Sequence, residues 1–293
     1  MKGTHHRGLL RKTACAAALV LVLGTAGSVP AENVRHAVFA VAISGSAETT
    51  MKKYQPLADY LSGKTGKAID VRVVKKYEDI LGLMQSGQAD IGVFGSIAGS
   101  EAFLEKKVIP VARPEKGGVS TYRGFLIARK DSGARKVEDL KGKTFDSNGG
   151  SASVGKFFPE KLLRDRKADF PSFFSRVTTS AKHEAVVYKV LNGEADCGTV
   201  KDTVFGKMAG ADPRVKNELV ILATSQKFPD GNVMVRSGAS AEFLRSIRRA
   251  LLAMDKDREA RPALEALGAD RFVLSEEKEF ETLGRAVHAL ERK

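Results

Sequence analysis

The chain has few of the residues that build covalent or metal-based sites. Its 293 residues include two cysteines and five histidines, and Cys15 and two of the histidines fall within the first 31 residues. The single remaining cysteine, Cys197, can form neither an internal disulfide nor a Cys-x-x-Cys redox centre. It lies in a strand-like segment, so we expect a buried small hydrophobe. The remaining histidines, His36, His183 and His288, lack the spacing of metal ligands, and no metal site is expected.

Motifs for catalysis and nucleotide binding are also missing. Gly45-Ser46 and Gly95-Ser96 lack the Gly-x-Ser-x-Gly pattern of a nucleophilic serine. No Gly-x-Gly-x-x-Gly sequence or P-loop follows a strand. We therefore expect no cofactor and no enzymatic activity. The alternative, a secreted hydrolase of anionic substrates, would have to use His183 with a nearby serine.

Long apolar runs are absent apart from one near the N-terminus, Ala14 to Leu23, which is short of the about 20 residues that span a bilayer. Four basic residues precede it, and small residues with Val29-Pro30-Ala31 follow it. This pattern predicts a cleavable signal peptide over residues 1–31 and export to the periplasm. An uncleaved anchor is the alternative interpretation.

Acidic residues are in the minority. The formal net charge is +13, and it is +9 without the predicted signal peptide. The basic residues are scattered and do not alternate with aromatics as in single-strand binders, so nucleic acid is not expected. The excess charge favours anionic ligands or an anionic membrane surface, with plain solubility as the alternative.

Strands and helices alternate along the remaining 260 or so residues, which predicts an α/β fold with largely parallel sheets. The predicted strands are 38–43, 68–74, 90–94, 124–129, 176–178, 195–200, 220–224 and 232–236, and residues 143–145 lead into a Gly/Ser loop. The predicted helices are 49–65, 77–86, 97–105, 157–163, 180–191, 241–254, 261–267 and 277–290. Ligands of such sheets bind at the carboxyl ends of strands, where Ser46 and Ser96 stand. Both serines have capping of the following helix as an alternative role.

Small and hydroxyl residues fill the segment from Asp146 to Gly155, just before a predicted helix. A helix N-terminus carries about half a positive charge and is suited to holding a phosphate, phosphonate, sulfate or carboxylate. The segment is therefore a candidate anion-binding loop, although ordinary turns have a similar composition.

Several short strings occur in an order typical of one family. They are Tyr54 to Ser62, Gly87 to Ile91 with Gly95, Tyr122 to Gly124, Asp139 to Phe145, His183 to Val186, Asn192 to Gly198 with Asp202, and Leu264 to Gly268. Together they resemble the phosphate/phosphite/phosphonate-type substrate-binding proteins of ABC transporters.

The resemblance implies a type II periplasmic binding protein. Such a protein has two α/β lobes, each a mostly parallel sheet with helices on both faces, and two crossing strands as a hinge. The lobes would be residues 32–120 with 228–293, and residues 121–227 carrying the Gly/Ser loop.

The resemblance also nominates ligand-binding residues. The family's phosphoryl-binding turn matches Ala152-Ser153-Val154-Gly155, where Ser153, the neighbouring Ser151 and the amides of Val154 and Gly155 would hold the anion. His183 matches a histidine that donates to the anion, with a surface position as the alternative.

Three further residues complete the candidate site. Asp202 matches an acid that meets the substrate amine in aminophosphonate binders, with a helix cap as the alternative. Asp230 stands in Pro229-Asp230-Gly231-Asn232, which is similar to the family's Pro-Asn-Asp-Pro with the acid displaced by one position. Tyr122 is expected either to line the cleft or to serve as a core or hinge aromatic.

These observations predict a monomeric, extracytoplasmic solute-binding protein. It would capture a small phosphonate- or phosphate-like anion, or an organic acid, between its lobes and deliver it to an ABC permease. A binding protein that feeds a membrane sensor kinase is the alternative.

Overall fold

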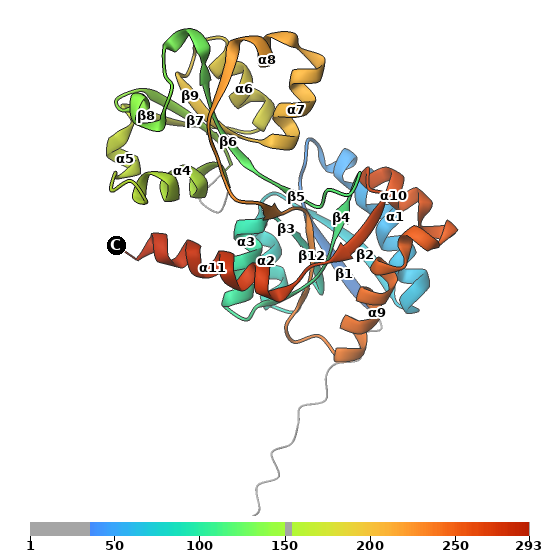
Figure 1. Cartoon of the computed structure of the whole chain (residues 1–293). Helices are drawn as coiled ribbons and strands as arrows, with labels where there is room; N and C mark the ends of the chain where they lie inside the picture. The colour runs from blue at the N-terminus through green and yellow to red at the C-terminus, as the bar shows by residue number, and fades with distance from the viewer. Residues whose placement is uncertain (1–35, 150–153, 293) are drawn as a thin grey trace, which may run out of the picture. The chain divides into compact units, whose positions relative to one another are not determined.

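The computed structural model describes residues 36–149 and 154–292 (Figure 1). The predicted signal peptide and two candidate ligand-binding residues, Ser151 and Ser153, lie outside the described residues. The described strands form two main sheets and one short strand pair.

The first sheet combines strands from both ends of the chain, in the order β13-β4-β12-β3-β1-β2. Its strands are β1 (His36–Ala42), β2 (Ala68–Val74), β3 (Ile91–Phe94), β4 (Val108–Glu115), β12 (Asn232–Arg236) and β13 (Arg271–Leu274). Its helices are α1 (Ala47–Thr65), α2 (Tyr77–Gln85), α3 (Ser96–Leu104), α9 (Ala241–Leu252), α10 (Arg261–Leu267) and α11 (Glu277–Glu291), with 3-10 turns η3 (Met254–Lys256) and η4 (Arg258–Ala260). One apolar cluster joins the sheet to α1, α9 and α10, and another joins it to α2, α3 and α11, so helices cover both faces.

The second sheet uses only the middle of the chain, in the order β10-β6-β9-β7-β8. Its strands are β6 (Gly124–Arg129), β7 (Thr144–Asn148), β8 (Arg176–Ser180), β9 (Cys197–Lys201) and β10 (Leu219–Thr224). Its helices are α4 (Val154–Arg164), α5 (Phe170–Phe173), α6 (His183–Leu191), α7 (Asp202–Ala211) and α8 (Pro213–Glu218), with 3-10 turns η1 (Lys130–Ser132) and η2 (Val137–Leu140). Separate apolar clusters hold α4 and α5, and α6 to α8, against this sheet.

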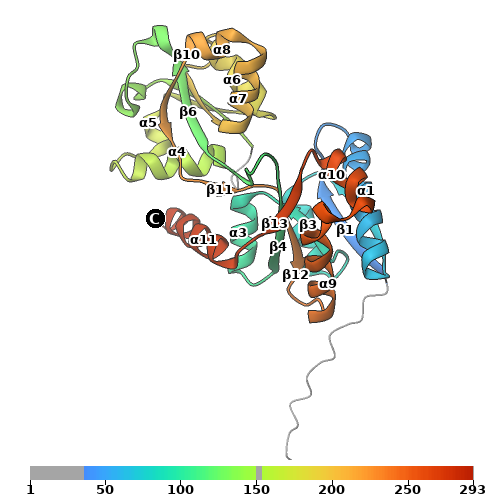
Figure 2. The same ribbon diagram turned by 45° about the vertical axis from the view of Figure 1, so that its right-hand side comes forward.

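Two segments connect the sheets. On the way out the chain passes through β5 (Thr121–Tyr122), and on the return it passes through β11 (Phe228–Pro229). The two strands pair antiparallel, and Figure 2 shows β11 between the two parts of the ribbon. Helix α11 contacts both α3 and α4, and it lies beside α3 in both views (Figure 1 and Figure 2).

The predicted two-sheet α/β architecture is confirmed, with one correction to the pairing. β1 is parallel to β2 and β3, and β7 is parallel to β8 and β9, as expected. The other pairs are antiparallel, so the sheets are mixed. In the first sheet, β12 enters from the return connection and inserts between β3 and β4, antiparallel to both.

The segment predicted to be an anion-binding loop is partly a strand. β7 continues through Asn148, and the side chains of Asp146 and Ser147 are buried in the second sheet. The Asp146 carboxylate accepts hydrogen bonds from Thr178 Oγ1 at 2.5 Å and Ser180 Oγ at 2.6 Å. Helix α4 begins at Val154, three residues before the predicted start. The connection between sheet and helix is therefore shorter than the sequence pattern suggested.

Candidate functional site

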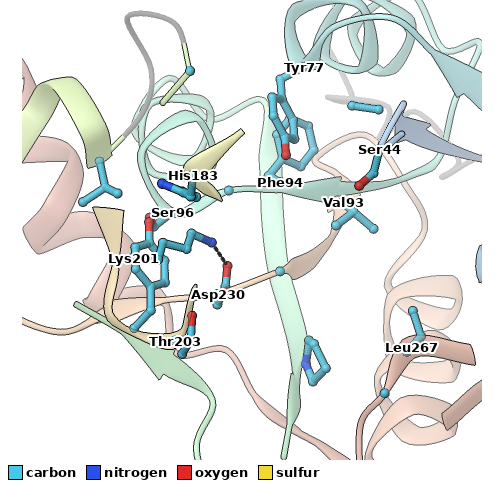
Figure 3. Close-up of a pocket in the computed structure, with 18 of the residues that line it drawn as sticks. Ser44, Tyr77, Val93, Phe94, Ser96, His183, Lys201, Thr203, Asp230 and Leu267 are labelled. Atoms are coloured by element: carbon cyan, nitrogen blue, oxygen red, sulfur yellow. Dashed lines mark hydrogen bonds and ion pairs between the residues drawn. The ribbon is translucent and has the colours of Figure 1, made fainter. Parts of the chain in front are cut away.

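A cavity of about 1120 Å³ lies between residues of the first sheet and residues of the second (Figure 3). It is lined where parallel strands end: by Ile43 and Ser44 after β1, by Phe94 and Gly95 at the end of β3, and by Asn148 and Lys201 at the ends of β7 and β9. Binding sites of α/β sheets are expected at this edge. Ligand sites commonly have volumes of about 300 to 1,000 Å³, and this cavity slightly exceeds that range.

Helices that pack on both sheets have their N-termini at this cavity. α3 starts at Ser96 after Gly95, and α6 starts at His183 after Lys182. Neither start has a hydrogen bond from a capping side chain. The first turns of these helices therefore present backbone N–H groups and a partial positive charge toward the cavity. Val154 and Gly155, at the start of α4, line it as well.

The structure brings six of the candidate residues to the cavity wall: Ser96, Tyr122, Val154, Gly155, His183 and Asp230. Ser46 and Asp202 are not among the lining residues. Ser46 is the N-cap of α1, where its hydroxyl accepts a hydrogen bond from Thr49 N at 3.1 Å. The Asp202 carboxylate accepts from Thr203 N at 2.7 Å in the first turn of α7. The Ser46 contact caps a helix start, which was the alternative role for that residue. At α7 the N-cap is Lys201, whose side chain makes no capping hydrogen bond to that helix start.

His183 contributes a neutral imidazole. Burial, followed by the positive charge of Lys201, lowers its pKa from 6.5 to about 4. At neutral pH the ring therefore carries one donor and one acceptor nitrogen and no charge. Nδ1 is buried and has no hydrogen-bond partner in the described part of the chain.

Lys201 was missed by the sequence prediction. It ends β9, and its Nζ lies 2.7 Å from Asp230 Oδ1 in the turn after β11. The same Nζ lies 4.0 Å from the centre of the Tyr122 ring. The only sequence signal for Lys201 was its position directly before Asp202. A lysine at a strand end otherwise resembles a surface residue.

Tyr122 connects the two halves of the site. Its hydroxyl lies 2.6 Å from Ser96 Oγ at the start of α3, and its ring packs on Phe228 of β11 with centroids 5.7 Å apart. Burial raises the pKa of the Tyr122 phenol, so the hydroxyl stays protonated at physiological pH. Tyr122 therefore both lines the cavity and belongs to the connection between the sheets.

The family description "ABC transporter, phosphonate, periplasmic substrate-binding protein" matches residues 39–280 of the chain. The chain belongs to this family. This confirms the resemblance drawn from the ordered strings between Tyr54 and Gly268. The family places the molecule among periplasmic binding proteins that serve an ABC permease and bind a small ligand.

The individual relatives have low sequence identity to this chain. The phosphate-import protein PhnD of Mycolicibacterium smegmatis is 25% identical over 215 residues, which cover 67% of each chain. PhnD1 of Prochlorococcus marinus, solved with methylphosphonate, superimposes with a TM-score of 0.71 at 17% identity, covering 89% of this chain and 100% of that one. XAC2383 of Xanthomonas citri, solved with ATP, gives 0.76 at 17% identity, covering 88% and 98%. At these identities the solved structures support the fold alone.

A close backbone approach explains one glycine of this phosphonate-family protein. A Cβ on Gly155 would lie 2.5 Å from the carbonyl oxygen of Asn148, closer than real Cβ contacts. Glycine is therefore required for the first turn of α4 to sit against the end of β7. The contact fixes that helix N-terminus beside the cavity.

Other features of this phosphonate-family protein do not form a second site. Cys197 is buried in β9, as expected, and burial raises its thiol pKa. Within residues 36–149 and 154–292, no group of acidic, histidine or cysteine side chains is arranged to hold a metal. In the same residues, no helix has the length and apolarity needed to span a bilayer.

Proposed function

We propose that the protein captures a small phosphonate- or phosphate-like anion in the cavity between its two sheets and delivers it to the permease of an ABC importer. The observation that carries this proposal is that uncapped helix N-termini from different sheets, at Ser96 and His183, line the same cavity. Their N–H groups offer hydrogen bonds to an oxyanion, and their partial charges favour it.

Side chains add to this anion site. The neutral imidazole of His183 and the hydroxyl of Ser96 supply further hydrogen-bond donors. The amides of Val154 and Gly155 supply donors at the start of α4, which the resemblance matched to a phosphoryl-binding turn. Ser151 and Ser153 precede that start in sequence and stay part of the proposed site. We propose binding without chemistry, because the lining residues that the structure describes offer hydrogen-bond donors, and none of their hydroxyls is hydrogen-bonded to a histidine or carboxylate.

We further propose that residues 32–120 with 228–293, and residues 121–227, act as two lobes that close on the ligand. The cavity is larger than a phosphate or methylphosphonate fills, so closure is needed to bring both sets of donors within hydrogen-bond distance. The two connections through β5 and β11 are the natural hinge. A ligand that contacts both lobes stabilises the closed state. We expect the protein to act as a monomer.

Isothermal titration calorimetry with phosphate, methylphosphonate, sulfate and acetate tests the anion site. We expect saturable binding of phosphate or methylphosphonate, and at 100 times the dissociation constant about 2.7 kcal/mol of added stability in thermal unfolding. His183→Ala should weaken that binding at least tenfold. His36→Ala is the matched control, because His36 is exposed and pairs with Asp70 outside the cavity. Absence of binding by all four anions would contradict the proposal.

A further inference from the structure

The cavity contains a position suited to a cation, and the protein fills it with its own side chain. The ammonium of Lys201 contacts the Asp230 carboxylate at 2.7 Å (Figure 3). It also lies over the face of the Tyr122 ring, 4.0 Å from its centre. A carboxylate beside an aromatic face is an arrangement that binds ammonium groups. The two charged residues come from different parts of the fold, one from the end of β9 and the other from the turn between β11 and β12.

Asp230 lies in a part of the cavity rich in tyrosine. Tyr54, Tyr77 and Tyr122 all line the cavity. Burial raises the pKa of each phenol, and the negative charge of Asp230 raises it further in all three. Among these rings, Tyr122 has a direct contact with the ion pair, because Lys201 Nζ lies 4.0 Å from its centre. An ammonium at this point would be attracted both by a charge and by aromatic faces.

The position that the resemblance assigned to amine binding carries a different charge at the cavity wall in this chain. Asp202, matched to an acid that meets a substrate amine, does not line the cavity. The residue before it, Lys201, does, and it brings a positive charge where an amine-binding site would present a negative one. A ligand amine would have to displace Lys201 from Asp230 or lie within a few ångströms of a like charge.

Building on the proposed anion-binding function, we propose that Lys201 determines the ligand class: its ammonium occupies the cation position formed by Asp230 and Tyr122, so the site selects phosphonates and related anions that carry no amino group. Asp230 is then the partner that holds Lys201 in place. The anion itself binds at the neighbouring helix N-termini.

Ethylphosphonate and 2-aminoethylphosphonate, which differ by one amino group, provide the test by calorimetry. The wild-type protein should bind ethylphosphonate at least tenfold more tightly. Lys201→Met removes the charge and shortens the unbranched side chain by one atom, so the affinity ratio should fall to about one or invert as Asp230 becomes available to the ligand amine. Adding Asp230→Asn to Lys201→Met should remove that gain. Lys116→Met is the matched control, since Lys116 also lines the cavity, and its ratio should match wild type.

The outcomes separate the two proposals. Wild-type protein that binds neither phosphonate overturns the anion-binding function together with this inference. Wild-type protein that binds both equally overturns the assignment of Lys201 alone, and this measurement requires no variant. A Lys201→Met protein with native circular dichroism and an unchanged affinity ratio also overturns it. Loss of ethylphosphonate binding in Lys201→Met, with the amino analogue equally lost, would make Lys201 an anion donor and overturn its assignment to the cation position.

Discussion

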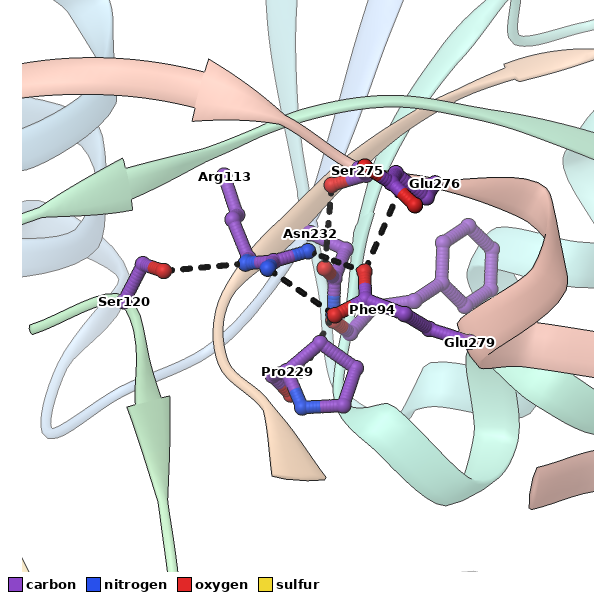
Figure 4. A network of polar contacts seen from close by, with 8 residues as sticks. All are labelled: Phe94, Arg113, Ser120, Pro229, Asn232, Ser275, Glu276 and Glu279. Carbon is purple, nitrogen blue, oxygen red and sulfur yellow. Dashed lines mark hydrogen bonds and ion pairs between the residues drawn. The ribbon is translucent and has the colours of Figure 1, made fainter. Parts of the chain in front are cut away.

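Among the ion pairs that join distant segments of this protein, two differ in how completely their atoms are used. In the first, Arg113 of β4 binds Glu279 of α11 through two nitrogens, at 2.5 and 3.0 Å, while its Nε donates to Ser120 Oγ at 3.2 Å (Figure 4). In the second, Lys201 makes one 2.7 Å contact with Asp230 at the cavity. The Arg113 and Glu279 side chains are 9% and 34% exposed, whereas those of Lys201 and Asp230 are 24% and 41% exposed.

We infer from this difference that the Arg113–Glu279 pair stabilises the fold, whereas the Lys201–Asp230 pair is accessible to a ligand. A bidentate arginine–carboxylate pair is strong and geometrically fixed. Around it, Glu276 N donates to Glu279, and Ser275 contacts the buried Asn232 at the start of β12. Lys201 carries three N–H donors and directs one to Asp230. Residues at the cavity are therefore expected to affect binding more than stability, and residues of the Arg113 network the reverse.

Glu279→Gln should produce the largest loss of stability. It leaves the nearly buried guanidinium of Arg113 without its counter-charge, and we expect the free energy of unfolding to fall by about 2–3 kcal/mol. Urea denaturation measures this. Glu277→Gln, at an exposed position in the first turn of the same helix, is the control. Equal losses of stability in Glu279→Gln and Glu277→Gln would contradict the distinction between the two ion pairs. A change of more than about twofold in the methylphosphonate affinity of Glu279→Gln would also contradict it.

His183 should show the next largest effect, and it depends on pH. Its folded-state pKa of about 4 lies below the 6.5 of an ordinary histidine, so between these values the unfolded chain binds a proton that the folded chain does not. The stability from the neutral ring is therefore complete above pH 6.5 and is lost as the pH falls through 4. In His183→Gln, the stability lost between pH 7 and pH 4.5 should be smaller by about 2 kcal/mol.

Urea denaturation of wild type and variant at the two pH values measures this difference, with His36→Gln as the exposed control. Parallel losses of stability in wild type and His183→Gln would mean that the imidazole is freely hydrated. The cavity wall would then differ from the Arg113 network less than we infer.

Local sequence signals predicted the elements whose determinants are local. The predicted strands 68–74, 124–129 and 232–236 match β2, β6 and β12. The helix predicted over residues 49–65 corresponds to α1, which ends at Gly66 in a left-handed conformation, with φ of 66°. β4 was missed because Pro110 and Pro114 interrupt its pattern. The structure accommodates Pro110 where the register with β12 shifts.

The candidate site was predictable only in part, for a similar reason. Ser96 and His183 stand at a strand end and a helix start, so topology alone directs them to the cavity. Asp146 was assigned to a loop because its partners, Thr178, Ser180 and Lys189, are more than 30 residues away in sequence. Lys201 and Asp230 are 29 residues apart and come together only because the chain crosses between the sheets.

Asp230→Asn should have the smallest effect on stability, although it breaks the ion pair at the cavity. Both partners are partly exposed to solvent, and pairs of this kind contribute little after hydration and side-chain entropy are counted. We expect the free energy of unfolding to change by less than about 1 kcal/mol in urea denaturation, measured beside Glu279→Gln under the same conditions. A loss as large as that of Glu279→Gln would show that the Lys201–Asp230 pair holds the two sheets together in the absence of ligand. In that case the free protein would be restrained by the same residues that we assign to ligand selection.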